Sequence, residues 1–250
     1  MRYFENTLKE QDVRVLEPEI YREWALECME DILQTLEQEG LGHDPSNYIG
    51  YGGVAYAMYH LNNCLRRHGK ELPEDIDKEL HRFAEKSLQY AELSFRALEG
   101  KSHEWSIFFG QAGAALVSAL CLQWNSYNID KHNTNLSSKV VARVKRFLEM
   151  SKRAQDVKEC KEDEVLYGRA GYVLGFAFLE ASLDPCFSSY LESNRSHLVS
   201  VAKTILDQGY RNARELKHQE NCPLWWEWHS SAYLGAAHGS MGAVAHVDLR

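Results

Sequence analysis

The sequence predicts an all-α protein built from helical hairpins, and three observations carry this prediction. Apolar residues recur at every third or fourth position over long stretches, which is the spacing of one buried helix face. Four Gly-x-x-Gly motifs occur along the chain, and each opens an apolar segment. No run in the 250 residues shows the sustained apolar and polar alternation, bounded by turn signals, that is typical of a half-buried strand.

The amphipathic stretches predict the outer helices. In the first of them, Ile20, Trp24 and Cys28 follow one another at four-residue spacing among acidic and polar side chains. The four stretches cover residues 19–38, residues 74–98, a segment that starts at 140 and a segment around 198–205. All five prolines fall outside the interiors of these predicted helices.

The glycine motifs predict the inner helices. They begin at Gly50, Gly110, Gly168 and Gly239, and the intervals between their second glycines are 60, 58 and 71 residues. The runs that follow, 54–61, 114–121, 172–179 and 243–247, are apolar on nearly all sides, as in a helix buried on most faces. We expect the glycines to allow close backbone approach and positive φ where a loop enters the helix.

Each repeat therefore consists of an outer amphipathic helix, a loop, a glycine turn and an inner apolar helix. A hairpin of this kind cannot bury its inner helix alone, so the repeats must stack on one another. Two architectures remain open at this point, a helical-hairpin solenoid and a closed α/α toroid. A period near 60 residues is long for a simple solenoid unit and favours the toroid.

Composition restricts the partners and the compartment. A net charge of −8 argues against a nucleic-acid groove, which needs surplus Lys and Arg. The six cysteines are widely spread without a Cys-x-x-Cys pair, so we expect reduced, mostly buried thiols. We find no signal-peptide core and no apolar run long enough for a transmembrane segment. These features predict a cytoplasmic protein, with association with the plasma membrane left open.

Two segments resemble the eukaryotic lanthionine synthetase C-like (LanC-like) proteins. They are residues 164–172 and residues 223–239, and the second contains the specific string Tyr-Leu-Gly-Ala-Ala-His-Gly. The opening segment 2–6 and the turn 49–53 agree with the same family. The resemblance implies one domain over residues 1–250 that belongs to a toroid of seven glycine-started hairpins around a zinc ion. About four of the seven hairpins are present in this sequence.

The resemblance also implies an activity. Bacterial members are lanthionine-forming cyclases that close thioether rings in peptides. Eukaryotic members bind glutathione and act as glutathione transferases, adding its thiol to dehydroalanine or dehydrobutyrine in proteins. The implied cofactor is zinc, glutathione is the co-substrate, and proteins that contain dehydroamino acids are the partners.

The zinc ligands that the resemblance implies are a cysteine and a later Cys-His pair, all after the Ala-Ala-His-Gly turn. None of the six cysteines here precedes a histidine, so we expect no metal ligand in this sequence. We expect a truncated toroid that is inactive alone and that associates through exposed inner helices. Whether the chain is an enzyme stays open, and the alternative is a non-catalytic helical adaptor that binds glutathione or proteins.

Two residues are the catalytic candidates that the resemblance implies. Thiolate attack on a dehydroamino acid leaves an enolate that needs a proton, and histidine suits that task near neutral pH. His238 of the Ala-Ala-His-Gly turn is the candidate acid/base, and Glu164 is the candidate carboxylate that orients it or tunes its charge. Two structural alternatives remain open: His238 as a helix cap, and Glu164 as part of the charged loop 158–164.

Two further residues are ligand-binding candidates. Arg169, inside the third motif, suits an anionic group such as a glutathione carboxylate, or it pairs with Glu164. Tyr233 follows a segment rich in tryptophan, which forms either a wall of the substrate cleft or core packing. The tryptophans of that segment are Trp225, Trp226 and Trp228.

Two other functions draw on the same region of the sequence. Cys222, His229 and His238 carry zinc-type donors, but their spacing matches no compact zinc site. A toroidal glycosidase would need two carboxylates on either side of a sugar, and Glu164 with Glu227 is the pair that the sequence offers.

Overall fold

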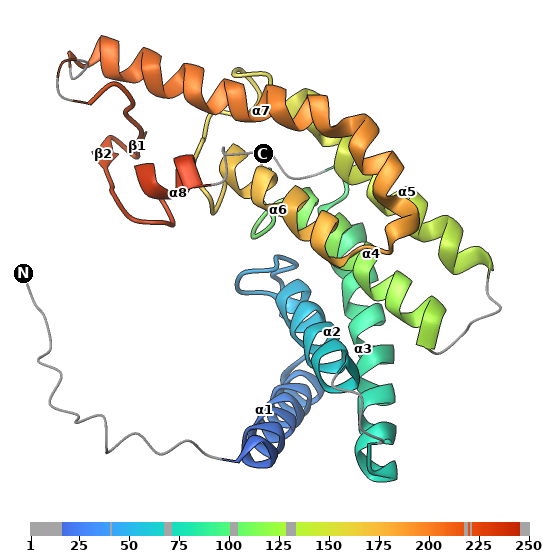
Figure 1. Cartoon of the computed structure of the whole chain (residues 1–250). Coiled ribbons are helices and arrows are strands. Elements are labelled where there is room, and N and C mark those ends of the chain that lie inside the picture. Colours follow the sequence, from blue (N-terminus) through green and yellow to red (C-terminus); the bar gives the residue numbers. More distant parts are fainter. Residues whose placement is uncertain are drawn as a thin grey trace, which may run out of the picture. The chain divides into compact units, whose positions relative to one another are not determined.

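The computed structural model describes residues 17–245 except residues 41, 68–71, 101–104, 129–133, 218–219 and 221. Eight α-helices dominate the described residues, which confirms the predicted all-α class (Figure 1). The chain divides into two compact units, residues 1–42 and 43–250, and each is described by itself. The single domain over residues 1–250 therefore stays a prediction, as does closure into a toroid.

The first unit contains one described helix, α1 (Pro18–Glu39). Pro18 lies in the first turn, where its missing N–H leaves no hydrogen bond unmade. Gly40, with a φ of 85°, ends the helix in a conformation that L side chains rarely adopt. The sequence prediction of residues 19–38 is confirmed, whereas the family-like segment 2–6 lies outside the described residues.

The second unit contains the other seven helices. Their bounds are α2 (Tyr51–Arg67), α3 (Glu74–Leu98), α4 (Gln111–Asn128), α5 (Thr134–Ala154), α6 (Arg169–Ser182), α7 (Ser188–Glu215) and α8 (Ser240–Ala245), with a short 3-10 helix, η2 (Pro185–Phe187), before α7. The helices α2, α4, α6 and α8 each begin one residue after the first glycine of a motif. Residues 246 and 247 of the last predicted inner run lie outside the described residues.

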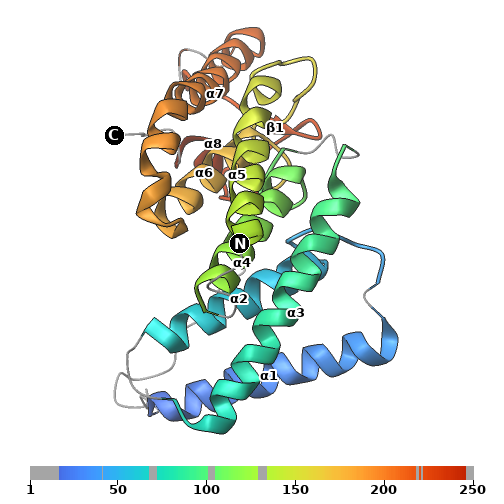
Figure 2. The same ribbon diagram turned by 90° about the vertical axis from the view of Figure 1, so that its right-hand side faces the viewer.

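Helix packing in the second unit follows the predicted hairpin order (Figure 2). The inner helices contact one another in succession, α2 with α4, α4 with α6 and α6 with α8. The outer helix α3 packs on α2 and α4, and α5 packs on α4 and α7. On α3 the buried apolar residues Leu80, Phe83 and Ala91 form one face, as its periodicity predicts.

The second glycine of each motif allows close backbone approach. A Cβ atom at Gly113 would overlap the carbonyl oxygen of Ile107, and one at Gly171 would overlap that of Val165. None of the motif glycines has a positive φ, since the glycines that do are Gly40, Gly42 and Gly100. The prediction of close approach is therefore confirmed, and the prediction of positive φ at these turns is wrong.

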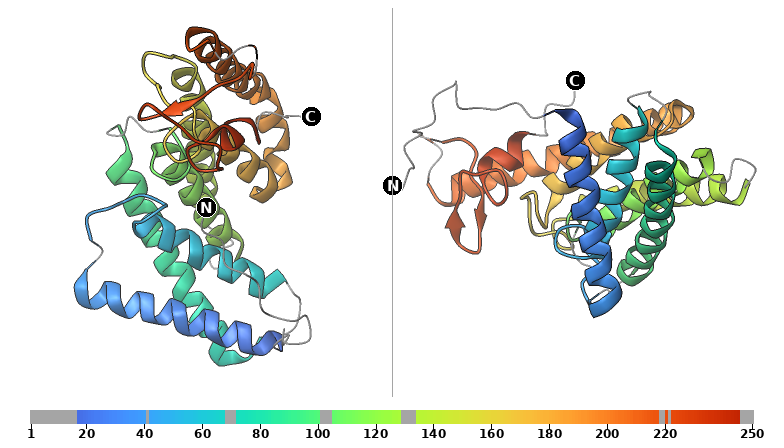
Figure 3. Two further views of the ribbon diagram at one scale, coloured as in Figure 1. Left: turned by 90° about the vertical axis from the view of Figure 1, so that its left-hand side faces the viewer. Right: turned by 90° about the horizontal axis from the view of Figure 1, so that it is seen from below.

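Two further expectations need correction. A short antiparallel hairpin joins β1 (Glu227–Trp228) to β2 (Ser231–Ala232), and it was not predicted because two-residue strands show no alternation (Figure 3). All six cysteines are free thiols, but only Cys121 and Cys160 are buried, so the prediction of mostly buried thiols is wrong.

Two observations bear on membrane insertion and on association of the chain. None of the helices among the described residues combines the length and the apolar character that a bilayer crossing requires. Leu234 and Met241, beside the fourth glycine motif, are largely exposed apolar side chains. Association of the chain through such residues stays a prediction.

Candidate functional site

A four-residue turn precedes each glycine motif, and in the second and third turns the first side chain caps the turn. The Ser106 hydroxyl accepts hydrogen bonds from the backbone N–H groups of Phe108 and Phe109, at 3.1 and 3.2 Å. The Glu164 carboxylate accepts the equivalent bonds from Leu166, at 2.8 Å, and Tyr167. The four turns are 46–49, 106–109, 164–167 and 235–238, and their first residues are Ser46, Ser106, Glu164 and Gly235.

Hydrogen bonds link each turn to the next. The N–H of Asn47 donates to the carbonyl of Phe108 at 2.8 Å, and the N–H of Val165 donates in the same way to Ala237 at 3.1 Å. Between the second and third turns, the Ser106 hydroxyl donates to the carbonyl of Leu166. The turns therefore lie side by side, although about sixty or more residues separate them in the sequence.

This alignment brings the two predicted catalytic residues together. His238 Nδ1 lies 3.0 Å from Glu164 Oε2, across a separation of 74 residues. The Glu164 side chain is 5% exposed and that of His238 is 23% exposed. The carboxylate is thus shielded from water, while the imidazole stays accessible. Among the described residues, the structure gives His238 Nε2 no hydrogen-bond partner, so this nitrogen is available to a ligand.

The electrostatics of the pair combine two opposing effects. Burial raises the pKa of Glu164 above its ordinary value, because removing the carboxylate from water disfavours its charged form. The N–H groups of Leu166 and Tyr167, and then His238, act in the opposite direction by stabilising the carboxylate. The carboxylate therefore faces the imidazole of His238 in a site that is partly shielded from water.

The aromatic segment before His238 has two different roles. The Trp228 ring stacks on the imidazole of His238, with centroids 3.8 Å apart and planes at 14°. Tyr233 is 43% exposed, with its ring centroid 6.1 Å from that of His238. Trp226, in contrast, is buried against Gly209, and its indole N–H donates to the carbonyl of Ile205 at 3.3 Å.

Trp226 is core packing, as one of the two interpretations predicts, whereas Trp228 and Tyr233 lie beside the imidazole. A wall of the substrate cleft stays a prediction. The stacking of Trp228 on His238 was not found from the sequence. The sequence pattern carries no signal for it, because residues two positions apart, such as Trp226 and Trp228, lie on the same side of a regular extended segment.

Arg169 has a structural role instead of the expected ligand-binding role. Its side chain is 1% exposed, and its NH1 donates to Asp163 Oδ1 at 2.6 Å. Its other donors bond the carbonyl oxygens of Ala154 and Cys160. The guanidinium therefore has no room for a ligand, and its carboxylate partner is Asp163, not Glu164. Burial raises the pKa of Asp163 to about 6, although Arg169 acts to lower it.

The zinc ion that the resemblance implies finds no donor set in the part of the chain that the structure describes. No three His, Cys, Asp or Glu side chains gather there as a metal site requires. Cys222 bonds the carbonyl of Leu224 through its sulfur, and His229 contacts the edge of the Trp228 ring. The described residues do not fit a zinc site.

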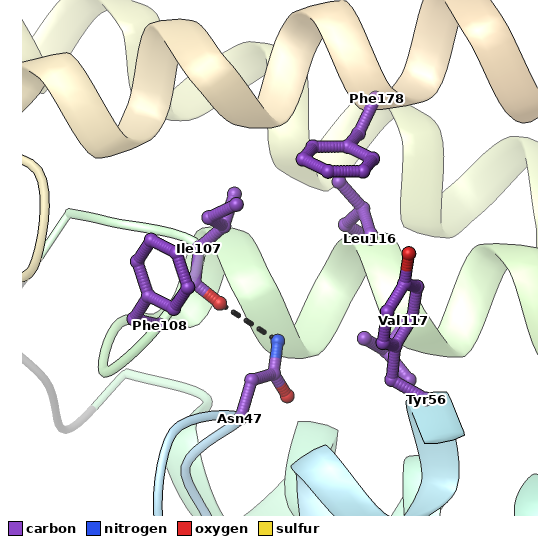
Figure 4. A pocket seen from close by; sticks show the side chains of 7 residues that line it. All are labelled: Asn47, Tyr56, Ile107, Phe108, Leu116, Val117 and Phe178. Carbon is purple, nitrogen blue, oxygen red and sulfur yellow. Dashed lines mark hydrogen bonds between the residues drawn. The ribbon is translucent and has the colours of Figure 1, made fainter. Parts of the chain in front are cut away.

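A small apolar cavity of about 120 Å³ lies between α2, α4 and α6 (Figure 4). At its edge the Asn47 side-chain amide donates to the carbonyl of Ile107 at 2.8 Å. The lining residues are Asn47, Tyr56, Ile107, Phe108, Leu116, Val117 and Phe178. Only Tyr56 among them is titratable, and burial raises its pKa further. The cavity therefore has no acid or base suited to neutral pH, in contrast to the His238 site.

Comparison with known proteins places these features in a family. Residues 43–250 match the family described as "Lanthionine synthetase C-like protein". The curated relative "Glutathione S-transferase LANCL1" of Danio rerio is 24% identical over 221 residues, which cover 87% of this chain and 47% of the relative. The chain thus spans about half the length of that relative. Since the family match includes all four glycine turns and the His238–Glu164 pair, the chain belongs to the lanthionine synthetase C-like family.

Proposed function

We propose that the chain carries the proton-transfer residues of a glutathione-related LanC-like activity, the addition of a thiol to a dehydroamino acid residue. The observation that carries the proposal is the 3.0 Å contact between His238 Nδ1 and Glu164 Oε2. The similarity to a protein named as a glutathione S-transferase supports glutathione as the thiol.

The reaction needs a group that takes a proton and returns it. The thiol sulfur loses its proton and forms a bond with the β-carbon of dehydroalanine or dehydrobutyrine. The π electrons of the carbon–carbon double bond move toward the α-carbon and its carbonyl, giving an enolate. In our proposal neutral His238 accepts the thiol proton at Nε2, and the resulting imidazolium donates it to the α-carbon.

Glu164 acts through His238 and is a positioning residue. Its carboxylate accepts a hydrogen bond from the Nδ1–H group of His238. This bond leaves Nε2 of the neutral ring free to act as a base. The same carboxylate stabilises the imidazolium that forms after the first proton transfer. Tyr233 is exposed beside this ring, and we propose that its phenol contacts the bound peptide or glutathione.

The proposal extends to cofactor, domain and compartment. In the family, zinc supplies the stabilisation of the thiolate when it is bound. We propose a single LanC-like domain over residues 1–250 and a cytoplasmic location, because that compartment keeps thiols reduced and all six cysteines are free.

The test is glutathione addition to a dehydroalanine peptide by the purified full chain, with and without added zinc. The product is identified by a mass increase of one glutathione above the uncatalysed background. We expect His238→Gln to lower the catalysed rate by about 100-fold or more, as for other general acid–base residues. Glu164→Gln should lower it about tenfold. The matched control is His43→Gln, which changes an exposed histidine in the same unit.

Two outcomes decide between proton transfer by His238 and a non-catalytic adaptor. A His238→Gln chain that forms thioether at the wild-type rate would show that His238 carries no proton. A wild-type chain that binds glutathione but forms no thioether, with or without zinc, would favour the non-catalytic adaptor.

A further inference from the structure

We infer that Trp228 is a positioning residue for His238, holding the imidazole in place and favouring its protonated form through the face of the indole ring. The inference rests on the proposed function for its kinetic consequence. The ring contact itself is a property of the structure and can be tested separately.

The geometry of the stack favours a cation. The two ring centroids are 3.8 Å apart and the planes are nearly parallel, at 14°. A cation over the face of tryptophan is attracted by the electron density of the ring. The observed stack therefore suits the imidazolium of His238, which is the form that donates a proton.

The charged form has support from two directions. The Glu164 carboxylate contacts Nδ1 at the edge of the imidazole, and the indole of Trp228 covers one of its faces. Among the described residues, the other titratable side chains whose rings lie near His238 are the phenols of Tyr167 and Tyr233, both with centroids at 6.1 Å. Glu164 and Trp228 thus provide the close contacts that stabilise a positive charge.

A second layer of rings holds the indole. Tyr167 is parallel to Trp228, with a centroid distance of 6.0 Å and an angle of 9°. Phe109 stacks on Tyr167 at 4.6 Å and 9°. Since Phe109 and Tyr167 are the last residues of the second and third turns, the aligned turns set the orientation of Trp228.

The hairpin carries strain where it presents Trp228. Its two turn residues, His229 and Ser230, have φ values of 50° and 58°. Positive φ at both positions is the pattern of a type I′ turn, which strongly prefers Asn-Gly. Non-glycine residues in this region persist where the surrounding structure determines them, often at functional sites.

The strand register explains why His229 and Ser230 keep their positive φ values. Trp226 is anchored in the core by its bond to Ile205 and by its contact with Gly209. Trp228, two residues later on the same extended segment, contacts His238. The strained turn follows immediately, so the chain reverses direction directly after placing the indole on the imidazole.

The experiment compares Trp228→Phe, which keeps an aromatic face, with Trp228→Leu, which keeps only apolar volume. His229→Asn is the matched control, because asparagine tolerates the positive φ and leaves Trp228 in place. Diethyl pyrocarbonate modifies neutral imidazole, and peptide mass spectrometry measures the rate at His238 relative to exposed His43. Thermal unfolding followed by circular dichroism shows whether each variant is folded.

We expect His238 of Trp228→Leu to react about three- to tenfold faster than wild type in mildly acidic buffer, because loss of the cation–π contact leaves more of the ring neutral. In alkaline buffer, where every ring is neutral, the ratio should fall to about one. Trp228→Phe and His229→Asn should stay within about twofold of wild type.

Equal rates of His238 modification in Trp228→Leu and wild type would overturn the inference. Equal modification rates in Trp228→Leu and Trp228→Phe would overturn it as well. A ratio that persists in alkaline buffer would overturn it too, because it would show that the indole only covers the ring. In the glutathione assay, Trp228→Leu should lower kcat with little change in KM, and phenylalanine should restore kcat. If no variant forms thioether, the proposed function fails while the modification rates still decide the role of Trp228.

Discussion

The second and third turns share one backbone plan but differ at their first residue. Ser106 is fully buried, and among the described residues its hydroxyl bonds backbone groups of its own turn and of Leu166. Glu164 caps its own turn in the same way, and its longer side chain also reaches His238. The comparison shows that both caps reach the next turn, but Ser106 meets a backbone carbonyl there, whereas the carboxylate of Glu164 meets the titratable side chain of His238.

The residues that receive this contact differ as well. The last residues of the four turns are Ile49, Phe109, Tyr167 and His238. The turn after that of Ser46 ends at Phe109 and the turn after that of Ser106 ends at Tyr167, whereas the turn after that of Glu164 ends at the imidazole of His238. We therefore expect the proposed chemistry between the third and fourth turns, where the titratable pair lies.

Gly113→Ala should have the largest effect on this shared plan. A methyl group there would overlap the carbonyl oxygen of Ile107, which is backbone and cannot rotate away. We expect a loss of about 3 kcal/mol or more in the free energy of unfolding, measured by urea denaturation. A loss below about 1 kcal/mol would show that the turns separate easily.

Glu164→Ser gives the third turn the same first residue as the second turn, which begins with Ser106. The serine should keep the turn capped, so stability should change by less than about 1 kcal/mol. Without the carboxylate beside His238, the rate of glutathione addition should fall by about 10- to 100-fold. Glu164→Ala is the matched variant that loses both the cap and the rate. An unchanged rate in Glu164→Ser would remove the chemical difference between the two turns.

Asp163→Asn tests the buried ion pair with Arg169. The pKa of Asp163 is raised to about 6 in the folded chain, so between about pH 4 and 6 the folded state holds a proton that the unfolded state has lost. The stability of wild type relative to Asp163→Asn should therefore fall by about 2 kcal/mol as the pH rises through this window. A rise over the same range would show that Arg169 outweighs burial.

Ser106→Ala tests the structural cap of the second turn. It would leave two N–H groups and the Leu166 carbonyl without their hydroxyl partner, at a cost of about 1.5 kcal/mol in unfolding free energy. Ser46→Ala is the matched control, since the Ser46 hydroxyl accepts a single long bond of 3.4 Å from Ile49. Equal losses in the two variants would contradict the difference in their bonding.

Gly235→Ser should have the smallest effect and the opposite sign. Nothing lies within 4 Å of a Cβ at Gly235, and its φ is not positive, so a serine fits there. A new cap on the fourth turn and a less flexible unfolded chain should raise the free energy of unfolding by about 0.5 kcal/mol. The melting temperature should rise with it. A lower melting temperature would show that the fourth turn has no donor to cap.

The fold was predictable where it depends on local sequence patterns. Periodicity placed α3 at residues 74–98, and the glycine motifs marked the starts of α2, α4, α6 and α8. The hairpin at 227–232 was missed, because two-residue strands are defined by pairing and not by pattern. The burial of Arg169 was missed because its partner Asp163 lies beside Glu164, and the sequence did not show which carboxylate it would meet.

The site was predictable in its residues but not in its arrangement. The family resemblance selected His238 and Glu164, and the contact between them depends on hydrogen bonds linking turns that are distant in the sequence. The position of Trp228 depends on the register of the hairpin, which follows from the anchoring of Trp226. Such features arise from tertiary packing, which local periodicity does not encode.

The bonds that align the turns place no constraint on how many residues intervene. The interval before the last motif is 71 residues, against 60 and 58 before, and it includes the 227–232 hairpin. Added length can therefore be inserted between two turns without disturbing their alignment. A repeat architecture of this kind can add structure beside His238 by lengthening a connection, while the aligned turns keep their hydrogen bonds to one another.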